Sequence, residues 1–166
     1  MIAFPPAKIN LGLHIIRRRN DGYHDLSTCF YPVQWCDILE VLPSDKPTFE
    51  SSGLSIPGNE KDNLCLKAYQ LLKDDFDIPP VKIYLHKIIP MGAGLGGGSS
   101  DGAWTLRLLN ELFGLCIAKA KLKEYASVLG SDCAIFVEDG PAMGSSRGEV
   151  LTPTSLSLKA LLRKSF

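Results

Sequence analysis

The residues from Pro90 to Asp101 have the composition of an anion-binding loop. Five glycines occupy the seven positions from Gly92 to Gly98, and two serines and an aspartate follow them. Glycine lets main-chain N–H groups approach an anion closely, and a helix N-terminus adds partial positive charge. Ser99 and Ser100 can offer oxygen to a hard cation such as Mg²⁺, or hydrogen-bond donors to phosphate. The residues expected to hold phosphate are Pro90, Met91, Gly92, Ala93, Gly94, Leu95, Gly96, Gly97, Gly98, Ser99 and Ser100.

The segments on either side of this loop must position it. Val81 to Ile89 alternates apolar and polar residues, which predicts a strand, and Gly102 to Phe113 has apolar residues at helical spacing. The loop lacks the lysine of the Walker phosphate loop, and no second strand with an acidic residue follows it, as a dinucleotide site requires. A protein-kinase glycine loop would lie between two strands. A flexible glycine linker is the alternative, but two periodic apolar segments seldom frame a linker.

The composition predicts one folded domain without affinity for nucleic acid or for a membrane surface. The 166 residues carry 18 basic and 18 acidic side chains, so the formal net charge is zero. The sequence has no long basic block and no apolar run of about 18 residues, the length that a membrane-spanning helix needs. The five cysteines include no C-x-x-C pair, so they indicate reduced thiols in a cytoplasmic protein rather than a zinc site.

The N-terminal part of the chain predicts two long strands joined by a hairpin. Ile2 to Ile16 is expected to form a strand or a bent pair of strands, and Leu26 to Leu42 a second strand with a bend near Pro32 and Asp37. Asn20 to Gly22 is a hairpin turn signal between them. The two strands should therefore lie side by side and antiparallel.

Lys8 stands in the middle of the first of these apolar strands. An unpaired ammonium group is expensive to bury, so this lysine needs an explanation. It can be an edge lysine whose head reaches water, or a positive charge that the strand holds rigidly in a site. The residues around it leave both interpretations open.

The remainder of the sequence alternates helical and strand-like patterns. Asp62 is expected to cap a helix from Asn63 to about Phe76, after a short polar-rich excursion. The other expected elements are a helix from Lys119 to Leu129, a short strand from Cys133 to Val137, and a last hairpin of Ala142 to Ser146 with Val150 and Leu151. This order predicts an α+β fold with helices on one face of a mostly antiparallel sheet.

Four motifs have a combined spacing that is informative: Pro6-Ala7-Lys8-Ile9-Asn10-Leu11, Asp21-Gly22-Tyr23-His24, the glycine loop itself, and Gly130-Ser131-Asp132. Together they resemble the GHMP small-molecule kinases, in particular the members that phosphorylate 4-diphosphocytidyl-2-C-methyl-D-erythritol. The glycine loop alone would indicate only the superfamily, whereas the first two motifs indicate the specific branch. The resemblance implies the fold of the GHMP-kinase N-terminal domain and transfer of the ATP γ-phosphate to an alcohol in the non-mevalonate isoprenoid pathway.

The resemblance also implies roles for individual residues. Asp132 matches the catalytic aspartate of the family, and Lys8 matches its catalytic lysine. The glycine loop would hold the triphosphate of ATP, with Mg²⁺ on a serine hydroxyl, and Asn63 would lie near the adenine. Asn10 would help to align the substrate, while Tyr23 would stack on its cytosine ring and His24 would bond the polar edge of that ring. Taken singly, Asp132, Tyr23 and His24 also fit a turn cap, a packing residue and a surface histidine.

The main departure from the family is length. GHMP kinases carry a C-terminal domain that closes the active-site cleft, and here the match fades after Leu151. The expected organisation is therefore an ATP-binding domain over residues 1–152 and a short tail over 153–166, with weak or no turnover. Two alternatives stay open: a GHMP kinase acting on another small alcohol such as mevalonate or homoserine, and a nucleotide-binding module without turnover. A missing domain would bare apolar surface, so self-association is also expected.

Overall fold

The computed structural model describes residues 1–158 except 21, 23, 147 and 149. Within these residues the chain forms two four-stranded sheets and three α-helices. The first sheet has the order β1-β4-β6-β5, and its strands are β1 (Ile2–Ala3), β4 (Ile38–Pro43), β6 (Val81–Lys87) and β5 (Thr48–Gly53). The second has the order β2-β3-β7-β8, and its strands are β2 (Pro6–Arg18), β3 (His24–Cys36), β7 (Ala142–Ser145) and β8 (Val150–Pro153). All neighbouring strands run antiparallel except β5 and β6, which are parallel.

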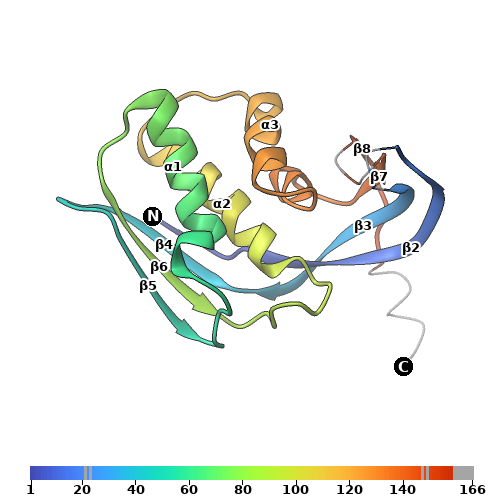
Figure 1. Cartoon of the computed structure of the whole chain (residues 1–166), viewed down its shortest axis with the longest axis horizontal. Coiled ribbons are helices and arrows are strands. Elements are labelled where there is room, and N and C mark those ends of the chain that lie inside the picture. Colours follow the sequence, from blue (N-terminus) through green and yellow to red (C-terminus); the bar gives the residue numbers. More distant parts are fainter. Residues whose placement is uncertain (21, 23, 147, 149, 159–166) are drawn as a thin grey trace.

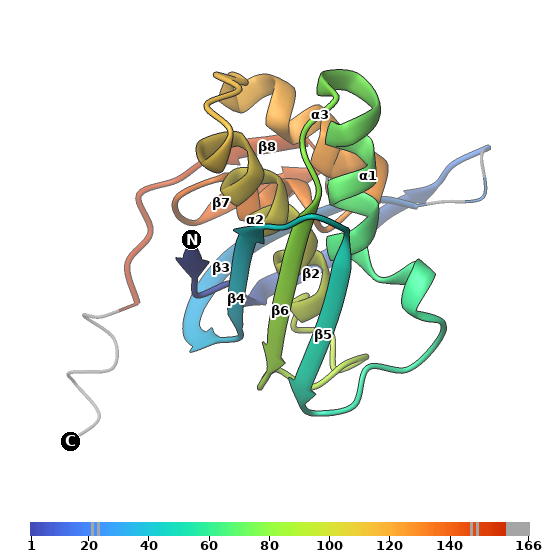
Figure 2. The ribbon, with the colours of Figure 1, turned by 90° about the vertical axis from the view of Figure 1, so that its left-hand side faces the viewer.

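The helices lie together on one side of the strands (Figure 1). They are α1 (Leu64–Phe76), α2 (Gly97–Leu112) and α3 (Lys119–Leu129), and two 3₁₀ helices cover Glu60–Asp62 and Ala134–Val137. Figure 2 shows α1 and α2 behind the sheet of β4, β6 and β5. The predicted α+β architecture, with helices on one face of mostly antiparallel strands, is therefore confirmed.

The core forms where the inward face of the first sheet meets α1 and α2. Val81, Ile83 and Leu85 of β6 are almost fully buried, because alternate residues of a strand share one face. They belong to one apolar cluster with Leu72 of α1 and Leu106 of α2. This packing fixes the strand that precedes the glycine loop against the helix that follows it.

The boundaries of several elements differ from the sequence prediction. Helix α2 begins at Gly97 rather than Gly102, so the serines that follow the glycines belong to its first turns. The cap of α1 is Asn63 instead of Asp62, because the Asn63 side chain accepts a hydrogen bond from the Cys65 N–H. These two corrections have one cause: the backbone hydrogen bonds of both helices start at polar or glycine residues that the apolar periodicity does not mark.

Three further differences concern strands. The segment Ala134–Val137 is a 3₁₀ helix, not the expected strand, because all four residues are buried with no neighbouring strand to pair with among the described residues. The expected long strand from residue 26 to 42 is divided at Asp37 between two sheets. The polar-rich excursion contains β5, which gains its hydrogen bonds from β6. The hairpin positions Asp21 and Tyr23 lie outside the described residues.

Two findings bear on the composition. The five cysteines, all within the described part of the chain, are free thiols, as predicted. In that same part, no helix is both long enough and apolar enough to span a bilayer.

Candidate active site

The glycine loop forms a concave cradle, defined here as residues Pro90–Ser99, at the N-terminus of α2. Together with Leu64 these residues line a cavity of about 280 Å³. Gly92, Gly94 and Gly96 have φ values of 74°, 74° and 70°, in the left-handed region that glycine adopts without strain. The first N–H groups of α2 have no partner within the helix and border this cavity, so the cradle offers main-chain donors to an anion.

The cradle is fastened to strand β2. The Lys8 N–H donates a hydrogen bond of 2.9 Å to the carbonyl of Leu95. Beside it, a Cβ atom on Gly96 would lie 2.9 Å from the Phe136 ring and 3.2 Å from Cε of Lys8. Gly96 is therefore required twice, for its backbone conformation and for the close approach of Lys8.

Lys8 and Asp132 meet beside the cradle. Their Nζ and Oδ2 atoms lie 3.3 Å apart, although 124 positions separate the residues in the sequence. The Lys8 side chain is 6% exposed, whereas that of Asp132 is 37% exposed. The lysine is thus buried up to its head, and the carboxylate stays accessible to a substrate. The two residues that the family resemblance names as catalytic therefore lie in contact, and the interpretation of Lys8 as an edge lysine in water is wrong.

A chain of hydrogen bonds orients the ammonium group. Lys8 Nζ donates to Asn10 Oδ1 at 2.7 Å, and Asn10 Nδ2 donates to Thr28 Oγ1 at 3.1 Å. The Thr28 hydroxyl in turn donates to the carbonyl of Gly12. Asn10 therefore lies beside the Lys8–Asp132 pair and orients the lysine head, while its predicted role in aligning the substrate stays a prediction.

A compact turn holds Asp132. It follows α3, and the Cys133 N–H closes the turn by donating to the carbonyl of Gly130 at 3.1 Å. The next four residues, Ala134–Val137, are buried and attach the turn to the core. The aspartate therefore projects from a rigid support.

The two serines of the cradle have different surroundings. Ser99 lines the cavity, while Ser100 is fully buried, does not line it, and has a hydroxyl without a hydrogen-bond partner among the described residues. Of the two predicted Mg²⁺ ligands, only Ser99 lies where it could reach a bound phosphate. No cluster of three or more His, Cys, Asp or Glu occurs in the described part of the chain. One hydroxyl beside a phosphate cradle fits Mg²⁺, which usually takes few protein ligands and several from phosphate and water.

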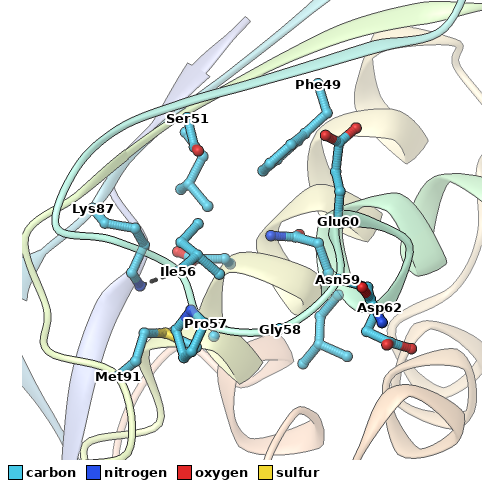
Figure 3. A pocket seen from close by; sticks show the side chains of 15 residues that line it. Phe49, Ser51, Ile56, Pro57, Gly58, Asn59, Glu60, Asp62, Lys87 and Met91 are labelled. Carbon is cyan, nitrogen blue, oxygen red and sulfur yellow. Dashed lines mark hydrogen bonds and ion pairs between the residues drawn. The ribbon is translucent and has the colours of Figure 1, made fainter.

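A larger cavity of about 400 Å³ adjoins the cradle. The two cavities share Leu64, Met91 and Gly98 as lining residues. Figure 3 shows side chains that line the larger cavity, with Lys87 and Met91 on one side of the view and Phe49, Asn59, Glu60 and Asp62 on the other. Asn63 also lines it, and its side-chain oxygen is engaged by the Cys65 N–H at 2.8 Å, so its amide NH₂ group remains available to a ligand.

The structure does not bring His24 next to Lys8. His24 begins β3 and pairs with Arg18, whereas Lys8 pairs with Pro32. Eight residues of strand separate His24 from Pro32, which corresponds to about 25 Å of extended chain. Tyr23, its predicted partner, lies outside the described residues. Register shifts between Leu11 and Leu13 and again after Ile15 bend the hairpin, and its far end curves toward the side of the sheets that carries the helices (Figure 1).

Sequence reasoning missed a buried trio of charges behind the cradle: Lys87, Asp37 and Asp101. Lys87 Nζ bonds both carboxylates, with 2.8 Å to Asp101 Oδ2, and the residues are at most 2% exposed. Asp37 also accepts from the N–H groups of Ile88 and Ile89. A Cβ atom on Gly97 would lie 3.0 Å from Lys87 Nζ, so the trio touches the first residue of α2.

Burial and pairing compete within this trio. Burial works against the charge of Lys87, but the two carboxylates outweigh it and hold the pKa of the ammonium group above its usual value. Burial raises the pKa of Asp101 to about 7, against the opposing pull of Lys87. The sequence carried one signal for the trio, because the alternation that buries Val81, Ile83 and Leu85 predicts the same face for residue 87.

Comparisons with known proteins agree with this geometry. Residues 63–140 match the family description "GHMP kinases N terminal domain". A 4-diphosphocytidyl-2-C-methyl-D-erythritol kinase from Bacteroides fragilis is 53% identical over 163 residues, which cover 96% of this chain and 60% of the relative. The chain contains a GHMP kinase N-terminal domain. Its fold is that of the N-terminal GHMP-kinase domain.

Two solved structures and a second curated relative support the same fold assignment. The Cytophaga hutchinsonii protein of the same name is 51% identical over 149 residues, 90% of this chain and 55% of the relative. A crystal structure of 4-(cytidine 5'-diphospho)-2C-methyl-D-erythritol kinase has a TM-score of 0.82 at 37% identity, over 95% of this chain and 56% of that one. The mevalonate kinase of Methanococcus jannaschii has a TM-score of 0.69 at 16% identity, over 98% of this chain and 58% of that one, which shows the shared fold alone. The chain thus spans a little over half the length of these relatives.

Proposed function

We propose that this chain provides the ATP site and the catalytic pair of a kinase that phosphorylates the 2-hydroxyl of 4-diphosphocytidyl-2-C-methyl-D-erythritol. The observation that carries the proposal is the Lys8–Asp132 pair, 3.3 Å apart beside a cradle of main-chain amides. Relatives at 51–53% identity are named for this activity. The runner-up is a GHMP kinase for another small alcohol, since mevalonate and homoserine kinases share the fold.

The nucleotide would occupy the two adjoining cavities. The triphosphate fits the cradle, where glycine N–H groups and the N-terminus of α2 offer donors and partial positive charge. The nucleoside fits the larger cavity, where Phe49 and Ile56 offer apolar surface and Asn63 an amide. The shared lining residues Met91 and Gly98 make one continuous site for ATP. Mg²⁺, held by Ser99 and phosphate oxygens, would neutralise charge on the phosphates.

Asp132 would act on the attacking hydroxyl. Its carboxylate takes the proton as the hydroxyl oxygen forms a bond to the γ-phosphorus, while the bond from that phosphorus to the bridging oxygen breaks and ADP leaves. The 37% exposure of the Asp132 side chain leaves room for this contact. Lys8 keeps Asp132 ionised and stabilises negative charge on the moving phosphoryl group, and Asn10 maintains the direction of its ammonium head.

The cytidine end of the substrate would lie along the β2–β3 hairpin. In 4-diphosphocytidyl-2-C-methyl-D-erythritol the cytosine ring is at the opposite end from the reacting hydroxyl, with a diphosphate between them. His24, at the far end of the hairpin, is the candidate partner for the polar edge of the ring, and Tyr23 the candidate stacking residue. The extra residues of β2, Gly12 and Ile16, bend the hairpin between His24 and the Lys8–Asp132 pair.

The test is transfer of labelled phosphate from ATP to three acceptors: the cytidine-linked substrate, mevalonate and homoserine. It is run on the 166-residue chain and on the chain joined to the remaining C-terminal portion of the Bacteroides fragilis relative. Phosphorylation of the cytidine-linked acceptor alone supports the proposal. Preference for another alcohol would support the runner-up, and ATP binding without transfer in both proteins would support a nucleotide-binding module.

A cytoplasmic location and self-association accompany this proposal. The free cysteines suit a reducing compartment. Leu13, Ile15 and Ile16 on the edge strand β2 are 56–67% exposed, which favours contacts with another protein surface. Sedimentation of the 166-residue chain over a range of concentrations measures its self-association.

A further inference from the structure

Asp37 is bound to the residues that lead into the glycine cradle. It is the single residue between β3 and β4, where the chain passes from one sheet to the other, and it is fully buried. A buried carboxylate has lost its hydration, so its oxygens need donors from the protein. Its side-chain donors are Lys87, Ile88 and Ile89, the three residues that come directly before the cradle.

One oxygen of Asp37 fixes the entry to the cradle. Its Oδ1 atom accepts from the N–H group of Ile88 at 2.5 Å and from that of Ile89 at 2.9 Å. Strand β6 ends at Lys87, so the carboxylate supplies acceptors beyond the point where the strand ends. This oxygen therefore sets the direction in which the chain leaves β6 and enters Pro90, the first residue of the cradle.

The other oxygen acts on the exit from the cradle. It accepts from Lys87 Nζ, which also bonds Oδ2 of Asp101 in the second turn of α2, at 2.8 Å. A Cβ atom on Gly97, the first residue of that helix, would lie 2.9 Å from the Ile89 side chain and 3.0 Å from Lys87 Nζ. Two of the residues that Asp37 holds therefore pack against the helix start that borders the cradle cavity.

The main chain of Asp37 is connected to the middle of the cradle. The Asp37 N–H donates to the carbonyl of Pro5 at 3.0 Å, and Pro5 directly precedes β2. Within β2, the Lys8 N–H donates to the carbonyl of Leu95 in the cradle. One buried residue is thus linked to the entry, the middle and the exit of the loop.

Asp37 can influence a ligand only through these residues. It lines neither the cradle cavity nor the larger cavity, and its side chain is closed to solvent. Main-chain donors stabilise an anion best when the protein holds them in place before the anion arrives. A displacement of about 1 Å, even one caused by a distant residue, can weaken such an arrangement about a hundredfold.

We propose that Asp37 is a positioning residue, which holds the cradle in the shape that accepts the phosphates of ATP before the nucleotide binds. The inference rests on the proposed function, in that the triphosphate must occupy the cradle. A purely structural role would make Asp37 important for folding alone. A positioning role makes it important for binding the phosphates as well, and the two roles can be separated.

The test compares the affinities of ATP and AMP, measured with Mg²⁺ by calorimetry on the full 166-residue chain at a temperature where each variant is folded. AMP leaves most of the cradle empty. Asp37→Ala removes the three side-chain contacts, whereas Asp37→Asn keeps one oxygen for Ile88 and Ile89 and loses the charge that faces Lys87. We expect the ratio of ATP to AMP affinity to fall about ten- to a hundredfold in Asp37→Ala, and less in Asp37→Asn. An unchanged ratio in both variants overturns the inference while nucleotide binding stands.

Leu72→Ala is the control for a general loss of stability. Leu72 is a fully buried core residue of α1 that lines neither cavity. Its truncation destabilises the same core by leaving a cavity, but it removes no hydrogen bond at the cradle. The ratio of ATP to AMP affinity should therefore equal that of the unmodified chain. A ratio that falls as far as in Asp37→Ala overturns the inference, because lost stability would then explain the effect.

Amide hydrogen exchange of the unmodified chain gives a readout that needs no variant, and it decides the matter if neither Asp37 variant folds. We expect the N–H groups of Ile88 and Ile89 to exchange slowly without nucleotide, because Asp37 already holds them. Fast exchange that slows only when ATP is added overturns the inference, since the nucleotide would then order the entry. If the unmodified chain binds neither ATP nor AMP, the proposed function fails together with this inference.

Discussion

Two lysines flank the glycine cradle, and their surroundings differ. Lys8 meets one carboxylate, Asp132, which is 37% exposed, whereas Lys87 meets two carboxylates that are almost completely buried. Adjacent glycines contact them: Gly96 packs on Lys8 and Gly97 on Lys87. The first pair can be reached by a substrate, whereas the charged side chains of the second group are closed off from solvent.

This difference in accessibility implies that lysine–carboxylate pairs have two different roles in this protein. An accessible pair contributes little to the free energy of unfolding, because water solvates its charges and screens their attraction. A buried group is costly to assemble, but removing one partner leaves an uncompensated charge in the interior. We therefore expect changes at Lys8 and Asp132 to affect chemistry, and changes at Lys87 and Asp37 to affect folding. The following predictions test that division.

The largest effect is expected on the rate of phosphoryl transfer. Asp132→Asn, in the chain joined to the C-terminal portion of its Bacteroides fragilis relative, should lower kcat by about 10²–10⁴-fold, because an amide cannot accept the proton. Thermal unfolding should show a change below about 1 kcal/mol in stability, as the carboxylate is partly solvated. Full activity in the variant, measured by labelled phosphate transfer, would mean that the exposed pair is not catalytic.

The second-largest effect is expected on the free energy of unfolding when Lys87 is replaced. Lys87→Met should reduce the free energy of unfolding by about 3–5 kcal/mol, because Asp37 and Asp101 would remain buried without a counter-charge. Urea unfolding followed by circular dichroism measures it. Lys46→Met, at an exposed lysine, is the control and should change stability by less than about 0.5 kcal/mol. A loss below 1 kcal/mol at Lys87 would show that the trio is not a structural requirement.

A double-mutant cycle can resolve which glycine belongs to which lysine. Gly97→Ala should cost about 1–3 kcal/mol, since its Cβ would lie 2.9 Å from Ile89 and 3.0 Å from Lys87 Nζ. It should couple to Lys87→Met by about 0.5 kcal/mol or more. Gly96→Ala, whose Cβ would meet Phe136 and Lys8 instead, should combine additively with Lys87→Met. Equal coupling energies of Gly96→Ala and Gly97→Ala with Lys87→Met would contradict the assignment of one glycine to each lysine.

The smallest effect concerns a third ion cluster, formed by Glu138 with Lys119 and Lys123 in the first half of α3. Burial opposes the charge of Glu138, but hydrogen bonds from Lys123 and Lys119 outweigh it and hold the pKa of Glu138 below its usual 4.5. A depressed carboxyl pKa stabilises the fold above the unfolded-state pKa, and this contribution is lost as pH falls through the folded-state value. Glu138→Gln should therefore melt at a lower temperature than the unmodified chain near neutral pH, and the gap should close under acid. A gap that is constant with pH would indicate packing rather than charge.

Much of the site could be predicted before the fold was known. The glycine composition of residues 92–98 indicated a phosphate cradle, and the motifs around Lys8 and Asp132 indicated the family and the pair. The α3 helix, Lys119–Leu129, begins and ends where its periodicity predicts. These features are local, because glycine conformation and helical spacing are written in consecutive residues.

Two of the errors lie where a distant segment decides local structure. Residues 48–53 became a strand because β6 offers them a parallel partner, and Ala134–Val137 became a 3₁₀ helix because the interior closes around it. Ser100 turned inward because α2 begins five residues earlier than the apolar pattern indicates.

The sequence by itself determined the cradle, the family resemblance and the identity of the two charged groups beside the cradle, since each is encoded in a short motif. Only the tertiary structure decided which lysine pairs with a solvent-accessible carboxylate and which pairs with buried ones. Lys8 and Lys87 both stand in strands of alternating or apolar pattern, and both are buried. What distinguishes them is the accessibility of their partners, and burial depends on the whole packed chain rather than on any one segment.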